Sequence, residues 1–337
     1  MTSAELTIEP LAGLDEARAE WAALAAASGN VYATPEWCDA WLQHAVPGYD
    51  LEPRLFGARR EDGTLAAILP LVVVRGRYVR KLRFLGFGAA NQLGPIAASD
   101  DGAAATGALR QVLEATASDW DVFHGESLPA GDWAARLGAT EIGREGSPVA
   151  RAESWEDYLR GRSRSLRKEL GQKERRLAER GLAYKTVESE ADLGRGLDAL
   201  FTLHRARWGA DASPWFAGAE AFHRAFAAAA HRRGWLRLRL LEVDGSPVAA
   251  NYSFRFWDVE WSYQHGRDPA FEDASVGLLI LARAIHEAFD EGATEFSLGP
   301  GAQAYKLRFA TDDPGLDSVA RVHGLRGRAW LLAAKRA

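Results

Sequence analysis

Apolar and polar positions follow one another along this chain in a way that predicts helices and strands in turn. Residues 14–27 are rich in alanine and predict a helix. Residues 34–36, Thr-Pro-Glu, predict the start of a second helix, because proline is favoured in the first turn. Residues 54–74 hold two β-rich runs around an Glu-Asp-Gly turn at residues 61–63, which predicts a hairpin. Together with a later helix and strand, this order is typical of a mixed α/β fold.

The second half of the chain returns to the same order. Residues 193–209 and 219–234 predict helices, and residues 235–266 predict three strands. These strands turn at residues 244–245 and again near residues 257–258. Both halves contain a strand, an Asp-Gly turn and a strand, which is consistent with duplication although no sequence repeat is detectable.

A short segment of different composition separates the two halves. Residues 143–155 carry glycine, serine and proline, which is typical of a link between domains. We therefore expect one domain over residues 1–150 and a second over residues 151–310. Residues 311–337 are expected to form a strand and a helix, for which a return to the first domain is one placement.

The second domain begins with a strongly basic segment. Residues 154–181 predict one helix that Ser154 caps, and residues 160–180 hold nine Arg or Lys against three Glu. One interpretation is a solvated helix with ion pairs four residues apart, such as Glu169 with Lys173. The other is a site for a phosphate-bearing substrate or carrier.

Length and composition are those of a globular protein with two domains. The chain has 337 residues, of which 47% are hydrophobic and 26% are charged. Its net charge of −5 offers no overall basic field for nucleic acid, so any RNA binding would have to be local. The single cysteine, Cys38, excludes an internal disulfide framework and a cysteine-based zinc cluster. It lies among the apolar positions of a predicted helix and is expected to be buried.

The sequence predicts neither secretion nor a membrane span. Residues 1–20 lack the cationic start and apolar core of a signal peptide. The longest apolar run, residues 65–74, includes Pro70 and is too short to cross a bilayer, so it is expected to be a buried strand. We expect a cytoplasmic protein with no membrane partner.

The most informative segment is residues 262–310. It predicts a strand, a polar loop that ends at residues 275–277, an amphipathic helix, a second strand and a glycine turn that leads to Tyr305 and Lys306. The first amides of a helix have no intrahelical partner, and the helix dipole places its positive end there. Such a helix start binds anions, so the segment indicates a pocket for the pyrophosphate of a carrier.

The motifs of this segment occur in a characteristic order. They are Gly266-Arg267-Asp268-Pro269, Ser275-x-Gly277, Gly292, Phe296-x-Leu298-Gly299-x-Gly301 and Tyr305-Lys306. This order resembles the GNAT-type acyltransferases, most of all their CelD-like branch, which is related to the FemABX peptidyltransferases. The resemblance implies two tandem GNAT-like domains, each a twisted, mainly antiparallel sheet flanked by helices. The GNAT pyrophosphate loop, Arg/Gln-x-x-Gly-x-Gly/Ala, is reduced here to the sequence DASVG at residues 273–277.

The resemblance implies that residues at the helix start bind the acyl carrier. These are Ser275, Val276 and Gly277. The absence of a side chain at Gly277 would let a phosphate approach the backbone. For Ser275 a second interpretation is an N-cap, in which its hydroxyl accepts hydrogen bonds from the first helix amides.

Tyr305 and Lys306 are candidate catalytic residues. In the GNAT fold, a tyrosine soon after the fifth strand often protonates the departing thiolate, and Tyr305 lies near that place. A phenol with a pKa of about 10 suits a thiol whose pKa is about 8.5. Lys306 is expected to stabilise an oxyanion or a phosphate. The alternative is that Tyr305 packs at the edge of the core and Lys306 lies on the surface.

The strand that precedes the helix carries further candidates. Strand alternation predicts one face with Glu260, Ser262 and Gln264 and the other with Trp261, Tyr263 and His265. His265 is the candidate general base, with Glu260 as an alternative. The candidate substrate-binding residues are Arg207, Trp208, Tyr263 and Gln264. Arg207 would clamp a carboxylate or phosphate, and Trp208 would wall the pocket.

These features predict an N-acyltransferase with its active site in the second domain. An acyl group, most simply from acetyl-CoA, would move to an amine of a small molecule or an amino-acid-like acceptor. The amine would attack directly, since no activated Cys or Ser is visible. No hydrolase elbow, His-Glu-x-x-His or Walker loop occurs, and no metal is expected. Two alternatives remain: an aminoacyl-tRNA-dependent transferase, which would use the basic helix, and a non-catalytic GNAT-like binding protein.

Overall fold

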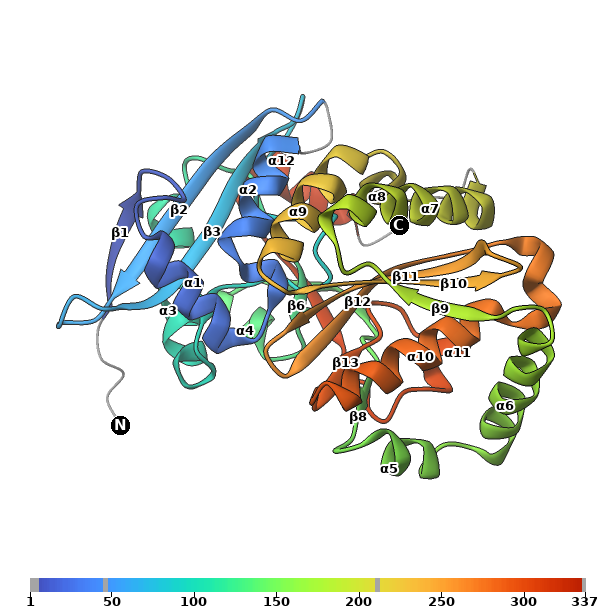
Figure 1. Cartoon of the computed structure of the whole chain (residues 1–337). Helices are drawn as coiled ribbons and strands as arrows, with labels where there is room; N and C mark the ends of the chain where they lie inside the picture. Colours follow the sequence, from blue (N-terminus) through green and yellow to red (C-terminus); the bar gives the residue numbers. More distant parts are fainter. Residues whose placement is uncertain (1–5, 45–47, 210–212, 335–337) are drawn as a thin grey trace. The chain divides into compact units, whose positions relative to one another are not determined.

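Two compact units make up the chain in the computed structural model, which describes residues 6–44, 48–209 and 213–334 (Figure 1). The N-terminal unit consists of Met1–Glu145 and Gly315–Ala337, and the C-terminal unit of Gly146–Pro314. Each unit is built around its own sheet. The last strand and the last helix of the chain therefore belong to the N-terminal unit.

The sheet of the N-terminal unit combines early strands with one from the end of the chain. Its strands are β1 (Thr7–Leu11), β2 (Leu51–Arg59), β3 (Leu65–Arg75), β4 (Arg80–Phe84), β5 (Ile96–Ala97), β6 (Val122–Pro129), β7 (Thr140–Glu145) and β14 (Leu316–Val322). Their order is β1-β2-β3-β4-β6-β14-β7, and β5 pairs with β3. The predicted hairpin is confirmed, because β2 and β3 pair antiparallel with Leu55 opposite Pro70. β4 and β6 run parallel.

The helices of the N-terminal unit bury a cluster of tryptophans. The helices are α1 (Arg18–Ser28), η1 (Val31–Ala33), α2 (Pro35–His44), η2 (Ser99–Asp101), α3 (Gly102–Ala115), α4 (Trp133–Leu137) and α12 (Gly324–Ala334). α2 begins as predicted, and the Thr34 hydroxyl accepts a hydrogen bond from the backbone N–H of Trp37 at 3.3 Å. Trp37 and Trp41 are buried with Cys38 between them. Burial raises the pKa of the Cys38 thiol, which is therefore a packing residue.

The C-terminal unit contains the three predicted consecutive strands and three shorter ones. They are β8 (Val149–Arg151), β9 (Ala183–Thr186), β10 (Leu236–Val243), β11 (Ser246–Phe256), β12 (Val259–Arg267) and β13 (Glu295–Ser297). The order is β8-β13-β12-β11-β10-β9, in which β12 and β13 run parallel and the other neighbours antiparallel. Asp244 and Trp257 have positive φ angles of 51° and 57°, at the two predicted turns.

The helices of this unit differ from the prediction at one place. They are α5 (Trp155–Arg160), α6 (Arg164–Ala178), α7 (Glu190–Trp208), α8 (Pro214–Ala217), α9 (Glu220–Arg232), η4 (Pro269–Ala274), α10 (Val276–Asp290) and α11 (Ala304–Leu307). The prediction of one helix over residues 154–181 is wrong, because the chain breaks into α5 and α6. Ser163 starts α6, where its hydroxyl accepts from the N–H of Leu166 at 3.2 Å. The predicted cap at Ser154 is confirmed by the N–H of Asp157 at 3.2 Å.

Helices cover both faces of the C-terminal sheet, with α10 on one face and α7 and α9 on the other (Figure 1). α7 approaches β12 most closely at Gly266. A Cβ atom at Gly266 would lie 2.7 Å from the backbone nitrogen of His204 and 2.7 Å from the Cβ of Leu203. Only glycine allows this separation of helix and strand.

We expect Gly266→Ala to destabilise the C-terminal unit by about 1–3 kcal/mol, because the added methyl group forces α7 away from β12. Urea unfolding followed by tryptophan fluorescence measures the loss. Gly194→Ala is the matched control in α7, since a Cβ there would meet no atom within 4 Å. That control should gain about 0.5–1 kcal/mol from the better helix propensity of alanine. A Gly266→Ala midpoint equal to that of the wild type would show that the contact is not limiting.

Candidate active site

The candidate site lies where strand β12 extends beyond the end of its pairing with β13. β12 and β13 pair only from Val259 to Trp261, whereas β12 continues to Arg267. Along Ser262–Arg267, β12 therefore keeps its pairing with β11 but none with β13. The start of α10 and the short helix α11 follow these two strands in the chain. We call the region formed by this strand edge, the start of α10 and α11 the candidate site.

A bulge changes which residues face the same way along β12. Tyr252 pairs with Gln264 and Ser253 pairs with Ser262, so Tyr263 is the extra residue of a bulge in β12. His265 then pairs with Asn251 and lies on the same face as Ser262. The predicted alternation, which put His265 and Ser262 on opposite faces, is therefore wrong beyond Tyr263.

His265 is held by this arrangement in a neutral state. Its Nε2 lies 2.8 Å from the Ser262 hydroxyl oxygen. Burial, and then the cations of Arg207 and Lys306, lower the pKa of His265 to about 3. The imidazole is consequently uncharged at pH 7. Arg207 and Lys306, which are far from His265 in the sequence, thus act on it electrostatically in the folded unit.

A buried ion pair lies beneath the same face of the sheet. Arg239 of β10 and Glu260 of β12 are 2% and 0% exposed at their side chains, and Arg239 Nη1 lies 2.5 Å from Glu260 Oε1. Ser253 donates to the same carboxylate at 2.6 Å. Glu287 of α10 accepts from Arg239 Nε at 2.6 Å. Because the Glu260 carboxylate is already engaged by Arg239 and Ser253, Glu260 is unsuited to the role of free base.

The ion pair is connected to the candidate site through Asn251. Asn251 Oδ1 accepts from Arg239 Nη1 at 3.3 Å, and its Nδ2 donates to the Ser262 hydroxyl at 3.4 Å. Ser262 in turn contacts His265. Our sequence analysis did not assign Arg239, Asn251 or Ser262 to the site. The available signal was the recurrence of polar residues at every second position of otherwise apolar strands.

The start of α10 has an unusual geometry. Ser275 is in the left-handed region with φ 56°, and its side chain makes no capping hydrogen bond. Its backbone carbonyl accepts from the N–H groups of Leu278 and Leu279 instead. The interpretation of Ser275 as a hydroxyl N-cap is therefore wrong. The amides of Val276 and Gly277, in the first turn, have no acceptor within the helix.

Basic side chains surround this helix start. Lys173 of α6 donates to the backbone carbonyl of Asp273, two residues before Ser275. Arg267 packs its Cδ 3.2 Å from where a Cβ of Gly277 would lie. No acidic residue occupies the first turn of α10, but Glu272 and Asp273 lie in the turn before it, and Glu272 pairs with Arg267 at 2.9 Å.

The predicted pair of Glu169 with Lys173 does not form. Glu169 instead accepts from Arg308 Nη2 at 2.6 Å, and Lys173 reaches Asp273. The reason is tertiary, because both side chains find partners in the segments before α10 and after α11 rather than on their own helix. The basic helix α6 is thus attached to the segments that build the candidate site.

Tyr305 of α11 and Arg207, near the end of α7, meet through their side chains. The Arg207 Cζ lies 5.9 Å from the centre of the Tyr305 ring. Burial raises the pKa of Tyr305, although Arg207 opposes this shift, so the phenol is protonated at pH 7. Arg207 also lies 4.5 Å from the ring centre of Trp208, whose side chain is largely accessible.

Lys306 holds the turn that precedes it. Its ammonium donates to the carbonyls of Gly299 at 3.1 Å and Pro300 at 2.6 Å, and the residue is only 8% exposed. The alternative of a surface lysine is therefore wrong. Because the Lys306 ammonium is bonded to the turn after β13, it positions α11, and with it Tyr305, relative to β13.

The structure does not bring Tyr263 and Gln264 to the other candidates. The Tyr263 ring packs among Phe216, His223 and Tyr252, with ring centres 5.3–6.3 Å apart. Gln264 shares its face with Tyr252, away from His265, and accepts a hydrogen bond from the His265 backbone N–H at 3.2 Å. The bulge places both side chains on the face that α9 covers, so neither joins the group of His265, Arg207 and Tyr305.

We expect the His265 side chain to stay uncharged well below pH 6. A free histidine titrates near pH 6.5, whereas burial and two cations lower the pKa of His265 to about 3. Between these values the unfolded chain binds a proton that the folded unit does not bind. The free energy of unfolding therefore falls as the pH drops from about 6.5 to about 3, by at most about 1.4 kcal/mol per pH unit for this residue.

Urea unfolding at pH 7, 6 and 5 measures this slope, and His265→Asn should make it shallower by that amount. His204 and His223, whose pKa values burial lowers to about 4 and about 3, retain their own contributions in the variant. NMR titration of the His265 imidazole with a midpoint near 6.5 would contradict the assignment.

Comparisons with known proteins agree with this architecture. Residues 164–307 match the family described as Acetyltransferase (GNAT) domain. No curated protein matches the sequence of the chain. The solved structure of FemX aligns with 97% of this chain and 100% of its own, at 10% identity and a TM-score of 0.68. A tandem GNAT protein from the clavulanic acid biosynthesis pathway aligns over 95% and 99%, at 14% identity and a TM-score of 0.52.

A third solved structure, L-PGS from Bacillus licheniformis, covers 84% of this chain and 88% of its own at 12% identity, with a TM-score of 0.55. At such low identities these likenesses establish the fold. They confirm the predicted class, a mixed α/β protein with tandem GNAT-like domains. Within the described residues, no helix is both long and apolar enough to cross a membrane.

Proposed function

We propose, from the premise that residues 164–307 form an acetyltransferase (GNAT) domain, that this protein transfers an acyl group from acyl-CoA to an amine. The acceptor is a small molecule or an amino-acid-like molecule. The observation that carries the proposal is the start of α10, where unpaired backbone amides lie beside Arg267 and Lys173. The acyltransferase class itself follows from the domain, whereas the donor, the acceptor and the residue roles are our proposal.

The acyl carrier is proposed to bind through its pyrophosphate. The amides of Val276 and Gly277 would donate hydrogen bonds to phosphate oxygens, and the helix dipole favours the negative charge. Arg267 and Lys173 add two cations at the same end of α10. Gly277 keeps the backbone accessible, because any larger residue would place atoms where the phosphate approaches. This arrangement performs the role of a glycine-rich loop with fewer glycines.

The transfer is proposed as a direct attack on the thioester. The amine nitrogen forms a bond to the acyl carbon, the carbon–sulfur bond breaks, and the thiolate takes the proton of Tyr305. Tyr305 suits this role because its raised pKa keeps the phenol protonated, and Arg207 orients it. Water takes up the proton that the amine loses and returns a proton to the Tyr305 phenolate, so that an amide and a free thiol are the net products.

His265 is proposed to bind the amine rather than to hold its proton. A base is most effective when its pKa lies near the operating pH, and burial lowers that of His265 to about 3. Its neutral ring can still form a hydrogen bond to the attacking nitrogen. Ser262 orients the ring for this contact. We assign Lys306 to the support of Tyr305 through the turn that it holds.

An aminoacyl-tRNA donor is the second candidate, and α6 is the observation that favours it. Arg164, Lys168, Arg175 and Arg176 are exposed on this helix, and none forms a salt bridge within the described part of the chain. Such residues suit contacts with the phosphates of nucleic acid. The fold is also similar to that of FemX. Binding of acetyl-CoA and of aminoacyl-tRNA to the same protein distinguishes the two donors.

We expect Gly277→Asp to weaken acetyl-CoA binding at least about tenfold, because a carboxylate replaces open backbone where the pyrophosphate is proposed to bind. Isothermal titration calorimetry measures the Kd. Gly194→Asp adds the same side chain at an exposed position of α7 and should leave the Kd unchanged. Equal affinities for the wild type and a folded Gly277→Asp protein would rule out this pocket. Tight aminoacyl-tRNA binding without acetyl-CoA binding would favour the second donor.

We expect Tyr305→Phe to lower kcat by about 10²–10⁴-fold, the usual contribution of general acid–base assistance. The substitution removes one hydroxyl, so folding and the KM for acyl-CoA should persist. The assay uses saturating acetyl-CoA and an amine identified from an acceptor panel. Tyr184→Phe, which also removes a partly buried hydroxyl, is the matched control and should retain wild-type turnover. Unchanged kcat in Tyr305→Phe where chemistry limits the rate would leave Tyr305 with a structural role.

A further inference from the structure

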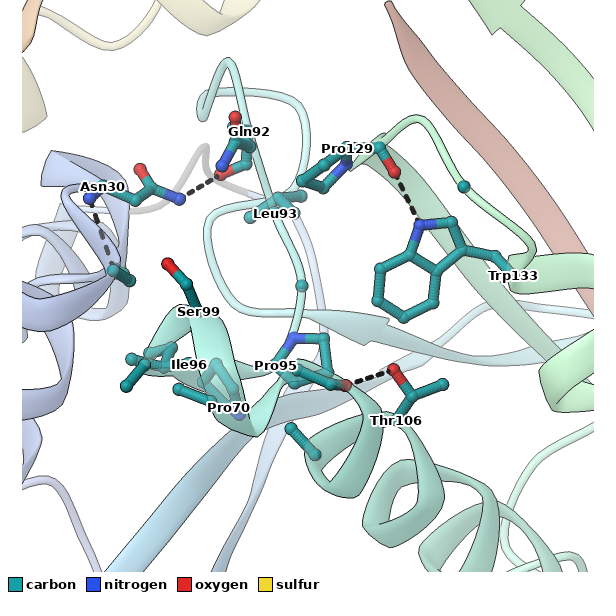
Figure 2. Close-up of a pocket in the computed structure, with 18 of the residues that line it drawn as sticks. Asn30, Pro70, Gln92, Leu93, Pro95, Ile96, Ser99, Thr106, Pro129 and Trp133 are labelled. Carbon is teal, nitrogen blue, oxygen red and sulfur yellow. Dashed lines mark hydrogen bonds between the residues drawn. The ribbon is translucent and has the colours of Figure 1, made fainter. Parts of the chain in front are cut away.

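A cavity of the N-terminal unit has no place in the reaction proposed for the C-terminal unit. It encloses about 560 Å³, which lies within the range of pockets for small organic ligands. Figure 2 shows its walls, with Asn30 and Trp133 on opposite sides and Pro70, Pro95 and Ile96 at its base. All of its lining residues belong to this one unit.

The cavity occupies a position that corresponds to the carrier pocket of the other unit. β4 and β6 pair in parallel only at Lys81 and Leu82, as β12 and β13 pair over a short length. The cavity is lined by residues that follow β4 and β6 and by the start of α3. One difference is that the Leu93 N–H donates to the Ser127 carbonyl at 2.9 Å, so a loop occupies the edge of β6.

Acidic residues precede the helix at this position, as they do in the C-terminal unit. Asp100 and Asp101 lie in the turn that leads into α3, and Glu272 and Asp273 lie in the turn that leads into α10. Asp101 is paired with Arg60, whereas Asp100 has no ion-pair partner within the described residues. The Asp100 carboxylate disfavours a second anion at the positive end of α3.

The interior of the cavity offers apolar contacts, and several polar side chains of its lining are hydrogen-bonded to the backbone. Asn30 donates to the Gln92 carbonyl at 3.3 Å and accepts from the Tyr32 N–H at 2.9 Å. Thr106 donates to the Gly102 carbonyl at 2.8 Å. The Trp133 indole N–H donates to the Pro129 carbonyl at 2.6 Å, which leaves the ring face beside the cavity (Figure 2). A ligand body that enters would thus meet proline, alanine and isoleucine side chains and an indole.

The rim of the cavity is polar and carries a net negative charge. Asp100, Asp132 and Arg136 line it, are exposed, and form no salt bridge within the described residues. Two carboxylates against one guanidinium favour a cationic head group over an anionic one. Ser99 adds a hydroxyl to the lining, on the side of Asn30 in Figure 2.

We propose that this cavity binds an organic amine, with an aromatic or aliphatic body in the apolar interior and an ammonium group at the rim. The interior supplies the driving force through burial of apolar area, and the rim carboxylates select the sign of the charge. The site belongs to the N-terminal unit and does not depend on the transferase reaction proposed for the C-terminal unit.

The test compares two probes of similar shape and opposite charge, 2-phenylethylamine and 3-phenylpropanoate. Saturation-transfer NMR and titration of the full-length protein measure their Kd values, and the amine should bind at least about tenfold more tightly. Asp100→Asn/Asp132→Asn should remove this preference without loss of fold. Glu61→Gln, an exposed charge outside the cavity, should leave it intact. Equal affinities for the two probes, or no amine binding at millimolar concentration, would overturn the proposal.

A second pair of variants locates the binding. Ala103→Trp places an indole in the cavity, since Ala103 lines it from α3, and should abolish amine binding. Arg110→Trp adds the same group on the exposed side of α3, and amine binding should persist. Retained amine affinity in Ala103→Trp would show that the probe binds elsewhere and would contradict the site. Acetyl-CoA affinity should not change in either variant, which separates this outcome from a failure of the proposed function.

Discussion

The buried ion pair between Arg239 and Glu260 is the interaction on which the C-terminal unit depends. Removing two charges from water is costly, and the cost is offset only when both are fully hydrogen-bonded. Here Glu287 accepts a hydrogen bond from the Arg239 guanidinium, and Ser253 donates one to the Glu260 carboxylate. The pair thus joins β10, β11, β12 and α10, and these elements must be in place before either charge can be buried.

The hydrogen bonds of this ion pair continue to His265 in the candidate site. Asn251 lies between the ion pair and Ser262, and Ser262 orients His265. Polar groups in a dry environment have few alternative partners, so each one restricts the rotamer of the next. These polar side chains take up space in the core that apolar side chains could fill. Their hydrogen bonds, however, fix the orientation of the His265 ring at the edge of the sheet.

The two units share a topology and differ in electrostatics. Among the described residues, each unit has one parallel pair of strands, β4 with β6 and β12 with β13. A helix starts near each pair, α3 in the N-terminal unit and α10 in the C-terminal unit. Two acidic residues lead into each helix, Glu272 and Asp273 before α10 and Asp100 and Asp101 before α3. Lys173 and Arg267 lie beside the start of α10, whereas Arg60 alone pairs with the acidic residues before α3. The start of α10 therefore has one more cation beside it than the start of α3. Fold similarity alone would not reveal this difference, because function depends on the side chains of the site.

The sequence by itself determined the class of the fold and most of the longer elements, although it did not show the break between α5 and α6. Local signals were sufficient for this: the turn residues at Asp244 and Trp257, the proline start of α2 and the spacing of apolar positions. The helix start at Val276 and the position of Tyr305 after a glycine turn also followed from local pattern, as did the likeness to GNAT proteins. Such features depend on neighbours within a few residues, which a sequence displays directly.

Only the tertiary structure decided which side chains meet. The bulge at Tyr263 exchanges the faces of Gln264 and His265, and no local signal marks it because it arises from the register with β11. Glu169 and Lys173 have the spacing of a helical ion pair, yet each is satisfied by a distant segment. Lys306 is drawn inward by two carbonyls that need a donor. In each case a long-range partner offers better hydrogen bonding than the local one, and the identity of that partner is a property of the folded chain.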